Sequence, residues 1–388
     1  MILRFSGFDD EWKTYKLKDL LHNKSSSISI NQLDDNVGNY PLYGASGFLK
    51  CIDFYEMDSD YISIVKDGSG VGNISFHEKN TSVVNTSQYI LPKENLNIHF
   101  IFYLLQTINL NKYKTGSTIP HIYFKDYSIE KVKIPKYDEQ KKIGILLKNL
   151  DAKIEILDNK LQMCQNFKKY LMQQIFTQKL RFADCTGEWN LFKLGDIVEL
   201  MRNGCSENQV SFETEFPVTR IETISKGILN FDKVGYVEKI DSSYLLQYGD
   251  ILLSNINSLK YIGNCVFFDE DKPLYHGMNL MLMRFKDDFN KKYLFYYMKF
   301  YQQWFQKMAC QAVNQASINQ SSLKKFPFYI PPTIDEQNKI VNVIDDTEHK
   351  INSIEDQIIK MEEFKKGLLQ QMFVVQLILS LLQNKKHI

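Results

Sequence analysis

The sequence has little that would mark a secreted, membrane-bound or metal-binding protein. Its six cysteines include no C-x-x-C pair, which argues against a disulfide framework or a zinc site and favours buried thiols in a reducing compartment. The start of the chain carries Arg4, Asp9 and Asp10 and has no apolar core, so we expect no signal peptide. The C-terminal stretch FVVQLILSLLQNKKHI falls short of the roughly 20 apolar residues of a transmembrane helix. We therefore expect a cytoplasmic location and no membrane partner.

An excess of charge is also missing. The 47 Lys and Arg residues balance 46 Asp and Glu residues, which gives a formal net charge of +1. This balance gives no overall support for a nucleic-acid partner, but it does not exclude a locally basic groove. The length of 388 residues is sufficient for two ordinary domains with separate cores.

Recognisable catalytic motifs are absent from the sequence as well. The only Pro-Pro pair, Pro331-Pro332, lacks the Asn or Asp and the aromatic residue of an adenine methyltransferase motif. The glycine-rich stretch DGSGVGN (67–73) lies between two expected strands, whereas a phosphate-binding loop needs a following helix. There is no P-loop, and the seven histidines are scattered. We therefore expect a chain that is not an enzyme and that holds no metal or cofactor of its own.

The chain is instead built from two copies of one unit. LRFSGFDDEW, from Leu3, matches LRFADCTGEW, from Leu180, and similar phrases follow, KTYKLKDL and NLFKLGDI. Weaker matches continue in the same order, such as FIFYLL with YLFYYM and VKIP with FYIP. The offset grows only in the middle, which indicates loops of differing length on one scaffold. Runs such as DYISIVKD predict strands, and KKYLFYYMKFYQQWFQKM (291–308) predicts one helix.

Each copy ends in a long helical segment. The segments open with Asp-Glu-Gln at Asp138 and Asp335, each after a proline, and close with Gln-Gln-x-Phe. Apolar residues recur in steps of three and four, the heptad pattern of a coiled coil, and Lys168 and Lys365 interrupt it at equivalent places. The expected seam residues are Ile143, Leu147, Ile154, Leu157, Leu161, Leu171, Ile340, Ile344, Ile351, Ile354, Ile358 and Leu368.

A narrow apolar seam needs a helical partner, and the other segment of the same chain is the natural one. If an approximate two-fold axis relates the copies, the two helices run antiparallel. Helices about 60 Å long, at 1.5 Å per residue, would then hold two similar heads at a set separation. DNA offers two half-sites at such separations. The alternative is that each helix packs only on its own domain.

Polar loops in each head are candidates for DNA contact. Lys residues suit phosphates, whereas amide and hydroxyl side chains suit base edges. In the first copy the candidates are Lys66, Ser69, Asn73, Lys112, Lys114, Ser117, Thr118 and His121. In the second copy they are Asn255, Asn257, Lys260, Asn314, Gln315, Ser317, Asn319 and Gln320. Solvated polar loops without a ligand are the competing interpretation.

The repeated phrases resemble those of a known family. The paired LRF and EW openings, the transitions from Ile-Pro to DEQ-x-KI, and the F-K-K-x-L-x-Q-Q-x-F helix ends are similar to the specificity subunit of type I restriction-modification enzymes. The resemblance covers residues 3–373, twice and in the same order. It implies that each head is a target recognition domain that reads one half of a bipartite, asymmetric site in double-stranded DNA.

The resemblance also implies partners for the helices. They would set the spacer and dock two modification (methyltransferase) subunits, with restriction subunits joining through the complex. S-adenosylmethionine, Mg²⁺ and ATP would bind only those partners, and none would bind this chain. The alternative is a coiled-coil adaptor that assembles protein partners without sequence-specific DNA binding.

The expected fold class is α+β. Two α/β target recognition domains are joined by a long antiparallel two-helix coiled coil, with an internal pseudo-two-fold repeat. The expected segments are a first target recognition domain (1–135), a central conserved helical region (136–180), a second target recognition domain (181–331), a distal conserved helical region (332–373) and a C-terminal tail (374–388). The tail departs from the family pattern.

Overall fold

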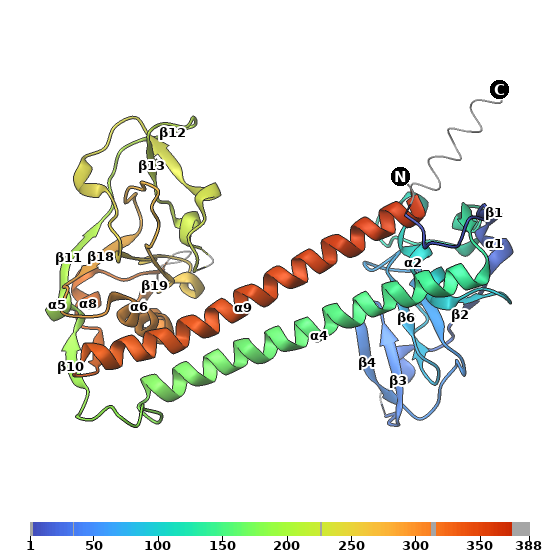
Figure 1. Ribbon diagram of the computed structural model, residues 1–388, viewed down its shortest axis with the longest axis horizontal. Helices are drawn as coiled ribbons and strands as arrows, with labels where there is room; N and C mark the ends of the chain where they lie inside the picture. Colours follow the sequence, from blue (N-terminus) through green and yellow to red (C-terminus); the bar gives the residue numbers. More distant parts are fainter. Residues whose placement is uncertain (1–2, 34, 226, 312–315, 375–388) are drawn as a thin grey trace. The chain divides into compact units, whose positions relative to one another are not determined.

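The computed structural model describes residues 3–33, 35–225, 227–311 and 316–374 (Figure 1). Internal contacts divide the chain into two compact units. The first unit contains Met1–Lys160 together with Ile354–Ile388, and the second contains Leu161–Ser353. Each unit therefore holds one globular head and parts of both long helices.

The head of the first unit, head 1 (13–134), is built around a four-stranded antiparallel sheet. Its order is β2-β8-β5-β6, and β4-β3-β7 and β1-β9 form two smaller sheets. Helix α2 (Ile98–Gln106) contacts β5, β6 and β8 of the main sheet. The bounds of the other elements are β1 Lys13–Lys16, α1 Leu17–Leu20, β2 Leu21–Ser25, β3 Tyr40–Gly44, β4 Gly47–Ile52, β5 Tyr61–Val65, β6 Ile74–His77, β7 Ser82–Val83, β8 Ser87–Pro92, α3 Phe124–Tyr127 and β9 Lys131–Ile134.

The head of the second unit, head 2 (190–330), has a main sheet of order β11-β18-β15-β17. Three smaller sheets accompany it, β10-β21, β12-β14-β13 and β16-β20-β19. The bounds are β10 Asn190–Lys193, α5 Leu194–Ile197, β11 Val198–Asn203, β12 Gln209–Val210, β13 Phe216–Val218, β14 Gly235–Val237, β15 Ile251–Leu253, β16 Ile256–Asn257, β17 Cys265–Phe267, β18 Met281–Phe285, α6 Lys291–Phe300, α7 Gln302–Met308, β19 Cys310–Gln311, β20 Ala316–Ser317, α8 Gln320–Leu323 and β21 Pro327–Ile330.

The two heads share one topology. In both, the first and last strands pair with each other, and the main sheet is antiparallel with the same strand order. The matched phrases of the sequence fall on equivalent elements, because β5 corresponds to β15, β8 to β18 and α2 to α6. The internal repeat predicted from sequence is therefore confirmed. Head 2 has three smaller sheets where head 1 has two, and its β12-β14-β13 sheet has a small apolar cluster of its own around Val218 and Val237.

One predicted element is wrong in detail. The helix expected over residues 291–308 is divided into α6 and α7 at Tyr301, whose φ of −92° and ψ of 25° leave the helical region. The ring of Tyr301 packs 4.6 Å from Tyr297, and its hydroxyl donates to the Phe176 carbonyl at 3.3 Å. The bond to Phe176 is a tertiary contact, and it accompanies a break in a segment that contains neither Gly nor Pro.

The long helices are α4 (Tyr137–Phe176) and α9 (Ile334–Leu369), and a π-helical turn (Gln370–Val374) follows α9. In the first unit, early α4 pairs with late α9, where Lys365 Nζ lies 2.5 Å from Asp151 Oδ1. In the second unit, late α4 pairs with early α9 through Lys168 and Glu348. The helices therefore run antiparallel, and the predicted fold class is confirmed.

The expected seam residues face inward, but they do not all form one narrow seam. Ile154 and Leu161 are half-buried and the other ten are buried. Towards the helix ends the seam merges with the cores of the heads, since Ile143, Leu147 and Leu368 belong to the core of the first unit. Leu171, Ile340 and Ile344 belong to that of the second unit. The helices therefore pack on each other along the seam and on the heads at their ends. The second kind of packing is needed because the helix ends cover the apolar face of each head.

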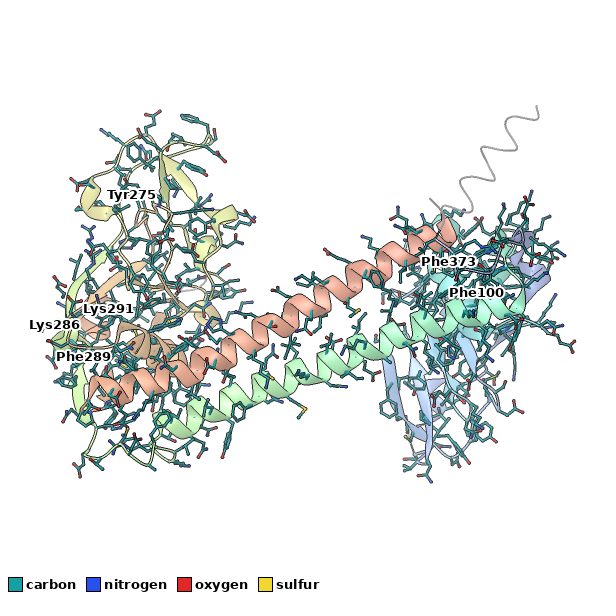
Figure 2. All side chains as sticks on the ribbon, viewed as in Figure 1. Phe100, Tyr275, Lys286, Phe289, Lys291 and Phe373 are labelled. Carbon is teal, nitrogen blue, oxygen red and sulfur yellow. The ribbon has the colours of Figure 1, made fainter. Side chains whose placement is uncertain are left out.

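Aromatic residues close these joints. In the first unit, Phe373 in the π-helical turn after α9 packs 5.3 Å from Phe100 of α2 (Figure 2). The same ring lies 6.3 Å from that of Trp12. In the second unit, Phe176 at the end of α4 packs 5.8 Å from Tyr293 of α6. The Gln-Gln-x-Phe ends therefore insert an aromatic ring into the head core, and replacing such a ring by Ala typically costs about 3–5 kcal/mol.

Candidate nucleic-acid interface

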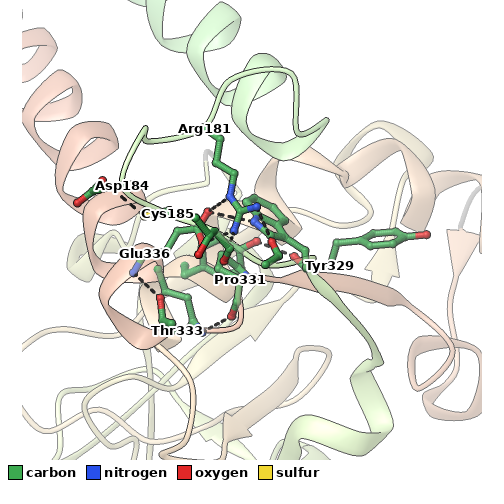
Figure 3. Close-up of polar contacts among 12 residues, drawn as sticks. Arg181, Asp184, Cys185, Tyr329, Pro331, Thr333 and Glu336 are labelled. Carbon is green, nitrogen blue, oxygen red and sulfur yellow. Dashed lines mark hydrogen bonds and ion pairs between the residues drawn. The ribbon is translucent and has the colours of Figure 1, made fainter.

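The repeated Asp-Glu-Gln motif joins head, helix and the LRF motif. In the second unit, Arg181 of LRF donates two hydrogen bonds to the buried carboxylate of Glu336, from Nε at 2.7 Å and from Nη2 at 2.8 Å (Figure 3). Trp189 Nε1 donates to the same carboxylate at 3.1 Å. Parallel bonds of this kind fix the planes of both groups, so they set the angle at which the chain enters the head.

The first unit repeats this ion pair. Arg4 donates to Glu139 from Nε at 2.9 Å and from Nη2 at 2.7 Å. The indole nitrogen of Trp12 has no partner among the described residues, so here Glu139 does not receive the third bond. The two joints are therefore built from the same residue types, but only in the second unit does the tryptophan donate a hydrogen bond to the glutamate.

The glutamine of the motif connects the helix to the head. Gln140 Oε1 accepts the backbone N–H of Asn97, the N-cap of α2, at 3.0 Å, and its Nε2 donates to the Pro135 carbonyl at 2.9 Å. Gln337 makes the same two bonds, to Asn290 at 2.9 Å and to Pro331 at 3.2 Å. A buried amide whose donor and acceptor are both used fixes a single orientation.

Sequence reasoning treated Asp-Glu-Gln as a helix start and missed its role as a joint. The acidic residues do lie in the first turns of α4 and α9. The partner arginines, Arg4 and Arg181, are separated from their glutamates by 135 and 155 residues. The available signal was the repetition itself, since an Arg and a Glu recur in both copies.

The lysines that interrupt the heptads also have matched partners. Lys365 pairs with Asp151, which accepts the Tyr103 hydroxyl at 2.7 Å. Lys168 pairs with Glu348, which accepts the Tyr296 hydroxyl at 2.7 Å. Each set joins a lysine of one helix, an acid of the other helix and a tyrosine of the head helix. A charged pair inside an apolar seam specifies the register of the helices.

Charge balance in the second set favours the ionised pair. Burial acts to raise the pKa of Glu348, but the hydrogen bond from Lys168 and the charge of Lys299 outweigh it and hold the pKa below its usual value. Burial lowers the pKa of Lys168, and the bond to Glu348 opposes that effect. The pKa of Tyr296 is raised, first by burial and then by its bond to Asp345.

The two predicted loops of head 1 come together. The backbone of His121 pairs with that of Thr115 in both directions, at 2.8 and 2.9 Å, and the Gly68 N–H donates to the Pro120 carbonyl at 3.0 Å. His121 Nδ1 lies 2.9 Å from Asp67 Oδ1. The loop between β5 and β6 is thus fastened to the loop after α2, and the two candidate loops form one surface.

The side chains of this surface differ in availability. Lys66 lies 3.4 Å from Asp67, and Lys112 pairs with Glu130. The exposed candidates are Ser69, Asn73, Lys112, Lys114, Ser117 and Thr118, whereas Lys66 and His121 are partly buried. Their contacts with DNA remain a prediction.

The candidate loops of head 2 also meet, in the small sheet β16-β20-β19. Asn257 pairs with Ala316, and the Ile318 N–H donates to the Asn255 carbonyl at 2.9 Å. The Asn255 side chain is only 4% exposed, so its position corrects the expectation of an open loop. The Asn255 Nδ2 donates to the Ile318 carbonyl at 3.4 Å, while the Asn255 Oδ1 has no partner among the described residues.

Other candidate side chains in head 2 form hydrogen bonds within the head itself. Asn319 caps α8 by accepting the Ser322 N–H at 2.8 Å, and Gln320 Nε2 donates to the Met201 carbonyl at 2.8 Å. Lys260 and Ser317 are exposed. Asn314 and Gln315 lie outside the described residues, as does the tail beyond Val374. Contacts of the candidate side chains with DNA remain a prediction here too.

Two heads of one topology, each with polar loops gathered on its surface and each joined to parts of the same two antiparallel helices, define a duplicated, two-headed protein. A family model described as the type I restriction modification DNA specificity domain matches residues 9–164 and 186–363. The chain therefore belongs to this family, and the family predicted from the repeated motifs is confirmed.

Individual relatives agree with the family match. A putative type I restriction enzyme specificity subunit of Methanocaldococcus jannaschii is 38% identical over 205 residues, which cover 50% of this chain and 48% of that relative. The chain thus spans about half the length of that relative. A putative specificity subunit of Haemophilus influenzae is 25% identical over 369 residues, or 90% of each chain.

A solved structure shares the fold. The crystal structure of a type-I restriction-modification system S subunit from M. genitalium has a TM-score of 0.67 at 15% identity, and the match covers 95% of this chain and 97% of that one. Within the described ranges, no helix is long and apolar enough to cross a membrane. In the same ranges, no group of three or more His, Cys, Asp and Glu residues could hold a metal ion.

Proposed function

We propose that this chain is the DNA-recognition subunit of a type I restriction-modification complex. Each head would read one half of a bipartite, asymmetric site in double-stranded DNA. The observation that carries the proposal is the duplication of one head on one antiparallel helix pair, with different polar loops in each copy. Equivalent joints give the heads equivalent attachments, whereas different loops suit different half-sites.

The helices would act as the spacer of this assembly and as the docking site for two modification subunits, with restriction subunits joining through the complex. The chain itself would be non-catalytic. S-adenosylmethionine, Mg²⁺ and ATP would bind only the partner subunits. The absence of methyltransferase and P-loop motifs from the sequence supports a non-catalytic role for this chain.

The direct test is a mobility-shift assay of the full chain, with and without a co-expressed methyltransferase subunit, together with methylome sequencing of cells that express both. Sequence-dependent binding and methylation at a two-part motif are the expected results. Assembly with partners but without sequence-dependent binding or methylation would instead support the protein adaptor.

The spacer role has a separate test, which uses the register of the helices. The Asp151–Lys365 pair places the position after Leu157 opposite the position after Ile358. A heptad inserted at both places keeps the seam in phase and lengthens the pair by about 10 Å, or roughly three base pairs. The expected motif keeps its half-sites while its gap grows; altered half-sites with the original gap would contradict a spacer.

A further inference from the structure

The second unit contains a basic groove that lies apart from the predicted DNA loops. It runs between the end of α4 and helices α6 and α7, and its cavity measures about 710 Å³. We call it the lysine groove. Four of its lining residues are lysines, namely Lys168, Lys169, Lys299 and Lys307. No Asp or Glu is among its described lining residues, so the groove is positive although the whole chain is almost neutral.

Two of these charges are free to meet an anion. Lys168 and Lys299 share one acid, Glu348, which Lys168 contacts directly and Lys299 approaches to 3.7 Å. Lys169 and Lys307 are exposed, and no described residue forms an ion pair with either. Glu348 lies outside the lining and can balance only one of the four lysine charges, so the groove keeps a net positive charge.

Aromatic side chains form the remaining wall. Phe300, Tyr301 and Trp304 line the groove together with three glutamines. Trp304 is held by packing 4.9 Å from Phe326, and Tyr301 is anchored by its bond to the Phe176 carbonyl. Lysines suit the phosphates of a nucleic-acid strand, and the amides beside them can donate to phosphate and sugar oxygens.

The groove is specific to head 2. Lys365 and Lys366 of α9 are the counterparts of Lys168 and Lys169, but α2 ends at Gln106 and is followed by no equivalent of α7. The first unit therefore has the lysines of the repeat without the aromatic wall.

We propose that the lysine groove binds the sugar–phosphate backbone of a DNA strand outside the bases that head 2 reads. This rests on the proposed function, because it assigns the groove a place on the DNA that the heads recognise. Charge complementarity selects this occupant, and an acidic surface of a partner protein is the competing outcome. Such contacts add affinity and orientation without sequence information.

The test is the double variant Lys169→Gln/Lys307→Gln. The matched control is Lys360→Gln/Lys366→Gln, two exposed lysines of α9 in the first unit that remove the same charge. Binding of each full chain, with its co-expressed methyltransferase subunit, would be measured from 50 to 200 mM salt on a duplex that carries the site found by methylome sequencing and on a scrambled duplex.

Each lost phosphate contact lowers the slope of log K against log salt by about 0.9. The groove variant should therefore lose about 1.8 from its slope, so that its affinity falls roughly tenfold less than that of the parent chain over this range. The control should keep the parent slope. Both should keep the parent preference for the specific duplex to within about twofold, because phosphate contacts carry no sequence information.

The proposal would be overturned if the groove variant kept the parent slope of log K against log salt. If the variant kept this slope but lost its methyltransferase subunit, the groove would instead be a protein-docking surface. The proposed function fails differently: the parent chain itself would show no preference for any duplex, whatever the slope of the variants.

Discussion

The Arg181–Glu336 joint yields a prediction whose size follows from its burial. The Glu336 side chain is fully buried and receives bonds from Arg181 and Trp189. Glu336→Gln keeps the shape of the side chain but removes its charge. Loss of one partner of a buried ion pair costs about 3–5 kcal/mol, because the other charge stays without compensation. Arg181 is 28% exposed, and water can replace part of that interaction, so we expect about 2–3 kcal/mol.

Local hydrogen exchange is the appropriate assay, since a chain of two compact units need not unfold in one step. A loss of 2–3 kcal/mol corresponds to a fall of about 30- to 150-fold in protection from exchange. The fall should appear in the amides of early α9 and of the segment around Arg181. The amides of head 1 lie in the other unit and should keep their protection.

Two comparison variants make the result decisive. Asp346→Asn makes the same chemical change at an exposed position of α9 and should alter protection by less than about 0.5 kcal/mol. Glu139→Gln should cost about 1 kcal/mol less than Glu336→Gln, because Glu139 receives no bond from Trp12. If Glu336→Gln behaved like Asp346→Asn, the joint would not hold the head to the helix.

Two further predictions concern the first unit. Phe373→Ala should destabilise it by about 3–5 kcal/mol, since the buried ring packs on Phe100, whereas Phe364→Ala at a 55%-exposed position of α9 should be nearly neutral; hydrogen exchange in α2 measures both. Burial lowers the pKa of His77 from 6.5 to about 4, so between these values the unfolded chain binds more protons than the folded one, and stability should fall as pH drops from 6.5 to 4. His77→Gln should flatten this part of the urea-denaturation profile, and an unchanged profile would rule out His77 as its source.

The fold could be predicted where the two copies support each other. Matched phrases identify the corresponding strands of the two copies, such as β5 and β15, and the corresponding helices α2 and α6. The heptads identify both long helices. The β12-β14-β13 sheet lies between β11 and β15, in a segment that contains no matched phrase, so the repeat gave no signal for it. The division of residues 291–308 at Tyr301 depends on packing against Phe176, a residue from a distant part of the chain.

The candidate site could be predicted only as far as loops, because side-chain availability depends on partners that a single sequence does not reveal. Asn255 and Gln320 were selected for their amides, yet both donate to backbone carbonyls of their own head. Lys169 and Lys307 could not be predicted as one site, because they are 138 residues apart in the sequence. They line one groove only because α7 folds against the end of α4.

The distribution of shared and differing residues explains how one scaffold could read a two-part site. The joints use the same Arg–Glu pair, the same glutamine bonds and the same lysine–acid–tyrosine sets in both units. The differences lie elsewhere, in the loops after the sheet strands, in the smaller sheets of the two heads and in the lysine groove. A head attached by geometry that both units share can differ in its contact surface without a change in its attachment. The repeated Asp-Glu-Gln motif therefore maintains the frame, and under the proposed function the unrepeated residues would determine which DNA is bound.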